Sequence, residues 1–181
     1  MGGFAASFFV YTSGMRNFVL TVVLCCTALQ TEAEAKFVQT PYGEQKVLFD
    51  FYFDDPNRIN AALFWIRSLM NPLMDAPYEM SPDFMEIKVI IHGTEIVTVA
   101  KHNYEKYRDA VERMRYYAEL GVEFRVCGLA AEDYGYSAGD FHNFIKMTPS
   151  AITELSHWHA QGFSLITPNV MDKKFSIEEI R

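Results

Sequence analysis

The chain has 181 residues, which is enough for one domain with a substantial core and too short for two domains of ordinary size. Half of the residues are apolar and 22% are charged, a balance typical of globular proteins rather than of disordered chains. The formal net charge is -7 and the sequence contains no cluster of Lys and Arg, so we expect no nucleic-acid partner.

The first 35 residues have the pattern of a secretory signal peptide. Arg16 supplies a basic start, residues 18–29 form an apolar run, and residues 33–35, AEA, have the form of a cleavage site. The pattern fits best when translation begins at Met15 and cleavage follows Ala35. An uncleaved anchor is the less favoured alternative, because a spanning helix needs about 20 apolar residues. We therefore expect a periplasmic or secreted protein with no stable membrane span after cleavage.

A linker is expected at residues 36–45, and from residue 46 the chain alternates between segments typical of strands and of helices. Residues 46–53, KVLFDFYF, have the aromatic and branched composition of a strand. Apolar residues at spacings of three and four then predict a helix that begins after Asp55-Pro56 and ends near Leu69. Residues 71–84 contain three prolines and are predicted to form a loop.

The same alternation continues through the rest of the chain. A helical region follows residue 95, with an interruption near 101–103, and a later helix begins after a turn-rich loop that follows Cys127. Four further strands are expected, at residues 85–93, 123–127, 144–148 and 163–167. The pattern predicts a single α/β domain at residues 46–168, with a mostly parallel sheet of about five strands and helices on both faces. Residues 169–181 are expected to form a polar tail.

Polar residues and glycines follow three of the expected strands at their carboxyl ends, where sites form in open α/β sheets. Asp54 follows the first strand, His92 and Gly93 close the second, and Cys127 and Gly128 close the third. The glycines would let a ligand approach the backbone. We therefore take Cys127 and His92 as candidate catalytic residues, and Asp54, Gly93 and Gly128 as candidate ligand-binding residues.

Two roles stay open for Cys127 on this pattern. Cys25 and Cys26 lie within the expected signal peptide, so the mature chain would keep one cysteine and no internal disulfide. A helix N-terminus and an imidazole nearby would favour the thiolate, which is the nucleophilic form. The alternative is a thiol packed as a small hydrophobic group, with His92 structural and Asp54-Asp55 an N-cap pair for the first helix.

No metal or cofactor site is predicted. His157 and His159 are two residues apart on an expected helix, so their side chains point to different sides and cannot share one ion. The sequence contains no phosphate-binding glycine loop, no nucleophile elbow and no dinucleotide-binding fingerprint.

Three segments in order give the sequence a resemblance to the DsrE/DsrF-like family. They are VIIHG at residues 89–93, GVEFRVCGLAAEDYG at 121–135 and PSAITELSHWHAQGFSLI at 149–166. The resemblance implies a compact α/β fold that assembles into homo-oligomers, usually trimers or hexamers. Several members are sulfur carriers, in which a cysteine accepts a persulfide sulfur from a donor and passes it to an acceptor protein.

The resemblance places Cys127 at the position of the carrier cysteine. It implies a persulfide carrier or transferase of sulfur metabolism with donor and acceptor proteins as partners, and the signal-peptide pattern adds that this member is exported. The alternative function is a non-catalytic oligomeric module that binds a small ligand or a partner chain, with Cys127 packed in the core.

Overall fold

The computed structural model describes residues 34–181, so the expected start at Met15 and almost all of the expected signal peptide lie outside the described residues. The chain divides into two units at Gln39. Residues 34–39 of the first unit have no regular secondary structure, and the second unit, residues 40–181, carries all of the helices and strands described below.

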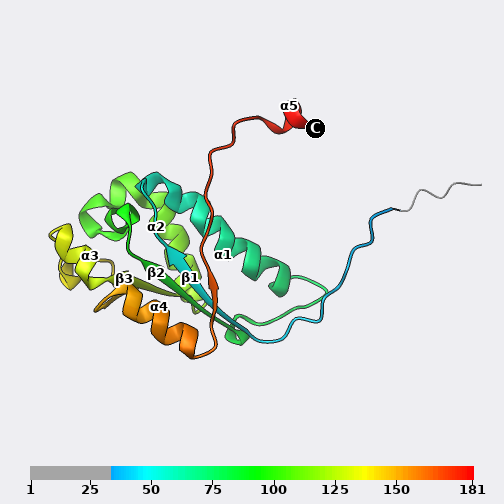
Figure 1. The fold of residues 1–181 in the computed structure, drawn as a ribbon, viewed down its shortest axis with the longest axis horizontal. Helices are drawn as coiled ribbons and strands as arrows, with labels where there is room; N and C mark the ends of the chain where they lie inside the picture. Colours follow the sequence, from blue (N-terminus) through cyan, green and yellow to red (C-terminus); the bar gives the residue numbers. More distant parts are fainter. Residues whose placement is uncertain (1–33) are drawn as a thin grey trace, which may run out of the picture. The chain divides into compact units, whose positions relative to one another are not determined.

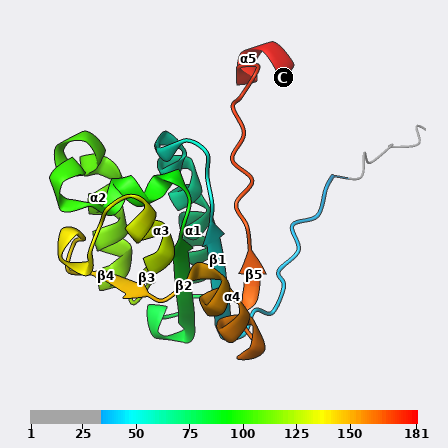
Figure 2. The ribbon, with the colours of Figure 1, turned by 60° about the vertical axis from the view of Figure 1, so that its left-hand side comes forward.

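The second unit contains a single sheet of five strands in the order β4-β3-β2-β1-β5, and every neighbouring pair is parallel (Figure 2). The prediction of one α/β domain with a mostly parallel sheet of about five strands is confirmed. The strands are β1 Gln45–Phe51, β2 Met85–Ile91, β3 Glu123–Cys127, β4 Ile145–Thr148 and β5 Ser164–Ile166.

Helices cover both faces of the sheet (Figure 1). The α-helices are α1 Ile59–Met74, α2 Tyr104–Glu119, α3 Gly128–Asp133, α4 Ala151–Ala160 and α5 Ile177–Ile180. The 3-10 helices are η1 Pro56–Arg58, η2 Pro82–Phe84, η3 Thr94–Val99, η4 Lys101–Asn103 and η5 Ala138–Asp140. Helices α1 and α2 pack together on one face, and α4 packs against β1 and β2 on the other. Parallel crossovers are right-handed, so the return from β4 to β5 across the sheet places α4 on the face opposite α1 and α2.

Helix α1 is longer than predicted, because it continues through Pro72 to Met74. The predicted loop at residues 71–84 is therefore wrong for its first four residues. Met70 and Leu73 of this last turn are 1% and 5% exposed, so their burial in the core outweighs the hydrogen bond that Pro72 cannot donate. A second difference is α3, a short helix within the predicted turn-rich loop.

The strands alternate between two packing layers with a period of two residues. Phe49 and Phe51 of β1 belong to the larger core beneath α1 and α2, whereas Leu48 belongs to a smaller cluster beneath α4. Ile90 of β2 and Cys127 of β3 belong to the same smaller cluster. This face of the sheet, which we call the α4 face, carries the polar side chains discussed below.

Candidate functional site

The sheet brings two of the predicted site residues together at the edge where β1, β2 and β3 end, which we call the carboxyl edge. Ile91 of β2 pairs with Val126 of β3, so the next residues, His92 and Cys127, are neighbours in register. Both fall in phase with the residues that face α4. The sequence therefore places an imidazole and a thiol on adjacent strand ends.

Cys127 is a free cysteine whose residue surface is 6% exposed. Its sulfur accepts a hydrogen bond from the backbone N–H of Ala130 at 3.5 Å, which makes Cys127 the N-cap of α3. It belongs to the smaller core cluster, whose other buried members are Leu48, Ile90, Ala151 and Phe163. The thiol is thus fixed at the start of α3 with little open surface.

The His92 imidazole forms a hydrogen bond to a carboxylate that sequence reasoning missed. Its Nε2 lies 2.7 Å from Oδ1 of Asp50, and the two side chains are only 15% and 19% exposed. Tyr52 stacks on the imidazole with ring centroids 4.8 Å apart. The hydroxyl of Thr167, just after β5, donates to the other Asp50 oxygen at 3.4 Å. The signal for Asp50 was available, since it is the one acidic residue within the apolar run 47–53.

A second missed residue, Glu95, fastens the ends of β1 and β2 to each other. Its side chain is fully buried, and its carboxylate accepts the backbone N–H groups of Phe53 at 3.0 Å, His92 at 3.1 Å and Gly93 at 2.8 Å. Burial raises the pKa of Glu95 above 4.5, against the lowering effect of these hydrogen bonds. Glu95 therefore fixes the backbone that carries His92.

The two predicted ligand-binding glycines both lie where the chain approaches its own backbone. A Cβ on Gly93 would come within 2.5 Å of the Phe53 nitrogen, and one on Gly128 within 2.7 Å of the Thr148 carbonyl oxygen. This crowding supplies a structural reason for glycine at each position. Their role in ligand binding stays a prediction.

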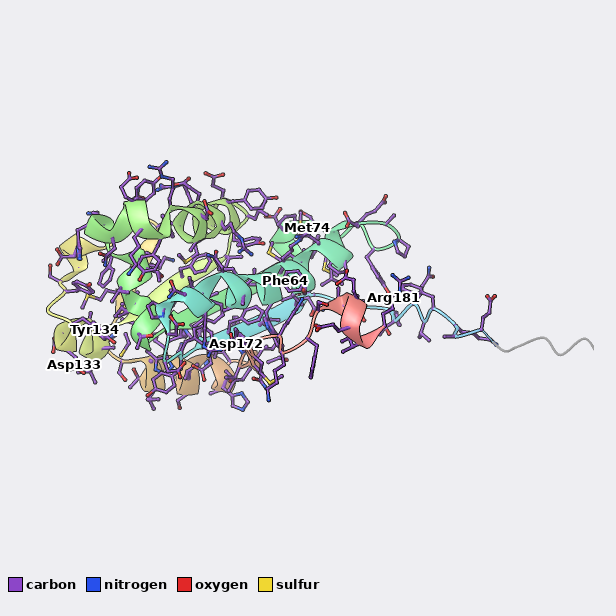
Figure 3. All side chains as sticks on the ribbon, turned by 90° about the horizontal axis from the view of Figure 1, so that it is seen from above. Phe64, Met74, Asp133, Tyr134, Asp172 and Arg181 are labelled. Carbon is purple, nitrogen blue, oxygen red and sulfur yellow. The ribbon has the colours of Figure 1, made fainter. Side chains whose placement is uncertain are left out.

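A pocket of about 390 Å³ opens at the carboxyl edge. Its lining includes three predicted residues, Asp54, His92 and Gly93. It also includes Ala130, whose N–H reaches the Cys127 sulfur, whereas Cys127 and Gly128 themselves do not line the pocket. The other lining residues are Tyr52, Phe53, Thr94, Asp133 and Tyr134. Figure 3 shows Asp133 and Tyr134 at one end of the domain and Met74, the end of α1, toward the other.

Asp54 lines both this pocket and a neighbouring cavity of about 640 Å³. Its side chain is 90% exposed and forms an ion pair with Arg58 at 3.3 Å. Arg58 also donates to the Val170 carbonyl at 2.8 Å, which ties the C-terminal tail to the same edge. The capping role belongs to Asp55, which accepts from the Asn57 N–H at 2.9 Å.

Charged residues fill the α4 face toward the opposite, amino end of the strands. Glu123 accepts hydrogen bonds from Lys88 at 2.9 Å, Arg125 at 2.8 Å and Lys146 at 2.7 Å. Arg125 also bonds Glu154 of α4 at 2.8 Å. Burial alone would raise the pKa of Glu123, but the hydrogen bonds from Lys146, Lys88 and Arg125 outweigh it and lower that pKa to about 2. We call this set the charged cluster.

Two further findings concern the described part of the chain alone. Within residues 34–181 there is no group of three or more His, Cys, Asp or Glu side chains placed to hold a metal ion. Within the same residues, no helix is both long enough and apolar enough to span a membrane.

Comparison with known proteins agrees with the topology. The model of the DsrE/DsrF-like family matches residues 45–168. No curated protein matches the chain. A solved structure with a similar fold is the protein of unknown function MTH1491 from Methanobacterium thermoautotrophicum, with 18% identity and a TM-score of 0.55. That alignment covers 68% of this chain and 99% of the other. Because the family model matches more than half of the sequence, the chain belongs to the DsrE/DsrF-like family, which is linked to sulfur relay.

Proposed function

We propose that the protein is a persulfide carrier in which Cys127 accepts a sulfane sulfur and passes it to another thiol. The observation that carries this proposal is the position of the thiol in a chain of a sulfur-relay family. Cys127 ends β3 beside a pocket at the carboxyl edge, with His92 as its neighbour in register. A pocket of about 390 Å³ is within the size range of sites for small molecules.

The transfer needs no oxidant or reductant. The Cys127 thiolate attacks the outer sulfur of a donor persulfide, R–S–SH, and a new S–S bond forms between Sγ and that sulfur. The donor S–S bond breaks, and the donor leaves as the thiolate RS⁻ with the bonding electron pair. Attack by an acceptor thiolate on the outer sulfur of the Cys127 persulfide repeats the same exchange in the opposite sense. His92 assists by taking the proton of the thiol.

We also propose that the protein acts outside the cytoplasm, in the periplasm or after secretion, as a homo-oligomer of three or six chains. The signal-peptide pattern of residues 1–35 supports export, and the family resemblance supports assembly. Purification from the periplasm of an expressing bacterium, with light scattering to measure the mass of the assembly, tests both parts. A cytoplasmic monomer would contradict them.

One observation favours a second candidate function, a module that binds a small ligand or a partner without chemistry. Cys127 is 6% exposed and packs in an apolar cluster, as an inert structural cysteine would. In this case the pocket holds its ligand non-covalently, and a Cys127→Ala variant binds it normally.

Intact mass spectrometry of the purified protein separates the two functions. We expect exposure to a polysulfide donor to add one sulfur atom, and a reductant to remove it. A gain that resists reductant would indicate sulfinic acid, and no gain would reject the carrier function. The isosteric Cys127→Ser variant is the matched control, and it also measures loading on Cys25 and Cys26 where these remain on the chain.

A further inference from the structure

We propose that Asp50 is a positioning residue that holds the His92 imidazole in the tautomer and orientation with which it takes the proton of the Cys127 thiol. This inference rests on the proposed role of Cys127 as a nucleophile. It assigns a function to a carboxylate that neither the motif pattern nor the family match points to.

The first support is the order of the strands. β1, β2 and β3 are neighbours in the sheet, and they contribute Asp50, His92 and Cys127 in that order. Asp50 pairs in register with Ile90, and His92 follows two residues later on the same side of β2. Three adjacent strands thus supply a carboxylate, an imidazole and a thiol to one face at one edge.

The second support is the hydrogen bond itself. An ionised carboxylate can only accept, so the 2.7 Å contact with Asp50 Oδ1 assigns the ring hydrogen to Nε2 of His92. Nδ1 is then the nitrogen that is free to receive a proton. A carboxylate that orients the base in this way is the common arrangement for activating a Ser or Cys nucleophile.

The third support is the restraint on the ring. Tyr52 stacks on one side of the imidazole with an interplanar angle of 19°, and Glu95 holds the His92 N–H at 3.1 Å. The His92 and Asp50 side chains are both mostly buried, which strengthens their hydrogen bond relative to one in water. The ring is therefore held by Asp50 and Tyr52, and the backbone that carries it is held by Glu95.

Other ionisable groups surround the pair, but Asp50 is the carboxylate bonded to the ring. Glu95 bonds the backbone of His92 rather than its ring, and Arg125, two residues before Cys127, is occupied by Glu123 and Glu154. The remaining ionisable groups that line the pocket are Tyr52, Asp54, Asp133 and Tyr134.

The step balances without a further reactant. The S–H bond of Cys127 breaks, its electron pair stays on sulfur, and the proton moves to Nδ1 of His92. The imidazolium that forms donates through Nε2 to Asp50, which stays ionised throughout. Removal of the Asp50 charge should therefore slow reactions that need the thiolate, and only at a pH where the free thiol dominates.

The test is the rate at which a small uncharged thiol reagent alkylates Cys127 in the folded protein, measured across pH. We expect Asp50→Asn to slow alkylation about 100-fold at neutral pH, the typical size of a general-base contribution. The rates of variant and wild type should converge at alkaline pH, where the thiol ionises without help. Asp83→Asn, an exposed aspartate near the amino end of β2, is the charge-matched control and should behave as wild type.

The double variant Asp50→Asn/His92→Gln provides a second test, which distinguishes a positioning role of Asp50 from a purely structural one. If Asp50 acts through His92, the double variant alkylates no more slowly than His92→Gln alone. An unchanged pH profile in Asp50→Asn, or an equal loss of rate at every pH, would overturn the inference.

Failure of this inference is distinguishable from failure of the carrier function, because alkylation does not require sulfur transfer. A shifted pH profile in a protein that takes up no sulfur would reject the carrier function and leave the positioning role standing. Sulfur loading of the wild type together with an unchanged pH profile in Asp50→Asn would reject the positioning role and leave the carrier function standing.

Discussion

The two ends of the α4 face share strands β2 and β3 and carry similar charged side chains, but they use these side chains in opposite ways. In the charged cluster, Glu123 accepts hydrogen bonds from three cations, Lys88, Arg125 and Lys146. At the carboxyl edge, Asp50 has one imidazole partner at 2.7 Å and one hydroxyl partner at 3.4 Å. The first carboxylate is held by three cations, and the second holds a group that can still exchange a proton.

The surroundings of the two ends reinforce this difference. Lys88 lies 4.1 Å from the centre of the Trp158 ring, and the indole N–H donates to Glu154 at 2.7 Å. The charged cluster thus joins the sheet to α4 through paired charges and a cation–π contact, although the buried Nε of Arg125 has no hydrogen-bond partner among the described residues. At the carboxyl edge the imidazole lines a pocket instead, and the thiol is bonded to Ala130, another residue of the pocket lining. We infer that the charged cluster stabilises the domain and that the carboxyl edge carries its chemistry.

The largest expected change in stability comes from Glu95, because its buried carboxylate accepts three backbone N–H groups at the carboxyl edge. Glu95→Ala leaves the N–H groups of Phe53, His92 and Gly93 buried without partners. At 1–3 kcal/mol for each such group, we expect a loss of about 4 kcal/mol in the free energy of unfolding, measured in urea. Glu95→Gln keeps one acceptor oxygen for the His92 and Gly93 N–H groups but sets an amide donor against the Phe53 N–H, so it should lose about 2 kcal/mol. Equal losses would show that the charge, rather than the acceptor, matters.

The next largest effect should come from the charged cluster. Glu123→Gln removes the anion beside Lys88, whose side chain is 7% exposed, and a buried cation without its partner costs about 3 kcal/mol. Lys146 binds the same carboxylate, but its side chain is 60% exposed. Lys146→Met should therefore cost less than about 1 kcal/mol. Urea unfolding of both variants measures the difference. A loss for Lys146→Met as large as that for Glu123→Gln would contradict the assignment of the burial cost to Lys88.

The charged cluster also predicts a pH dependence of stability. The pKa of Glu123 is about 2 in the folded protein against 4.5 for an unperturbed glutamate. A depressed carboxyl pKa contributes stability that is present above pH 4.5 and is lost as the pH falls from 4.5 toward 2. The free energy of unfolding, measured in urea across this pH window, should differ less between wild type and Glu123→Gln as the pH falls. A constant gap would mean that the ion pairs do not set the stability of this end.

A smaller effect tests whether Gly128 is needed for packing. A Cβ there would meet the Thr148 carbonyl oxygen at 2.7 Å, so Gly128→Ala must shift the backbone of β4, at a cost of about 2 kcal/mol. Gly43→Ala is the matched control, because nothing lies within 4 Å of its added Cβ. Full stability of Gly128→Ala together with a loss of sulfur loading would indicate a ligand-binding role instead.

The fold could be predicted from the sequence because its signals are local. Strand composition, helix spacing and the order of elements gave five strands and their parallel direction, and β3 was predicted at its observed bounds, Glu123–Cys127. The end of α1 was missed because proline predicts a break, whereas the burial of Leu73 favours a further turn. That burial depends on the core and cannot be read from the segment alone.

The candidate site was only half visible in the sequence for a related reason. Residues at the end of a strand stand out, so His92 and Cys127 could be named as candidates. Asp50 lies within a strand, and its importance depends on a partner 42 residues away. Glu95 reads as a first-turn acidic residue of a helix until its long-range bond to Phe53 is seen. The order of residues along the chain does not show which residues of neighbouring strands meet, so these two contacts could not be predicted.

The smallest expected effect concerns the fourth strand at the carboxyl edge. Thr167→Val removes the 3.4 Å hydrogen bond to Asp50 while keeping the shape of the side chain. The threonine is exposed and water can replace its hydroxyl, so we expect a stability change below about 0.5 kcal/mol and at most about a twofold change in the alkylation rate of Cys127. A rate loss as large as that of Asp50→Asn would mean that β5 sets the orientation of the carboxylate. The orientation of Asp50 at the carboxyl edge would then depend on four strands, and Asp50, like Glu123 in the charged cluster, would be fixed by more than one partner.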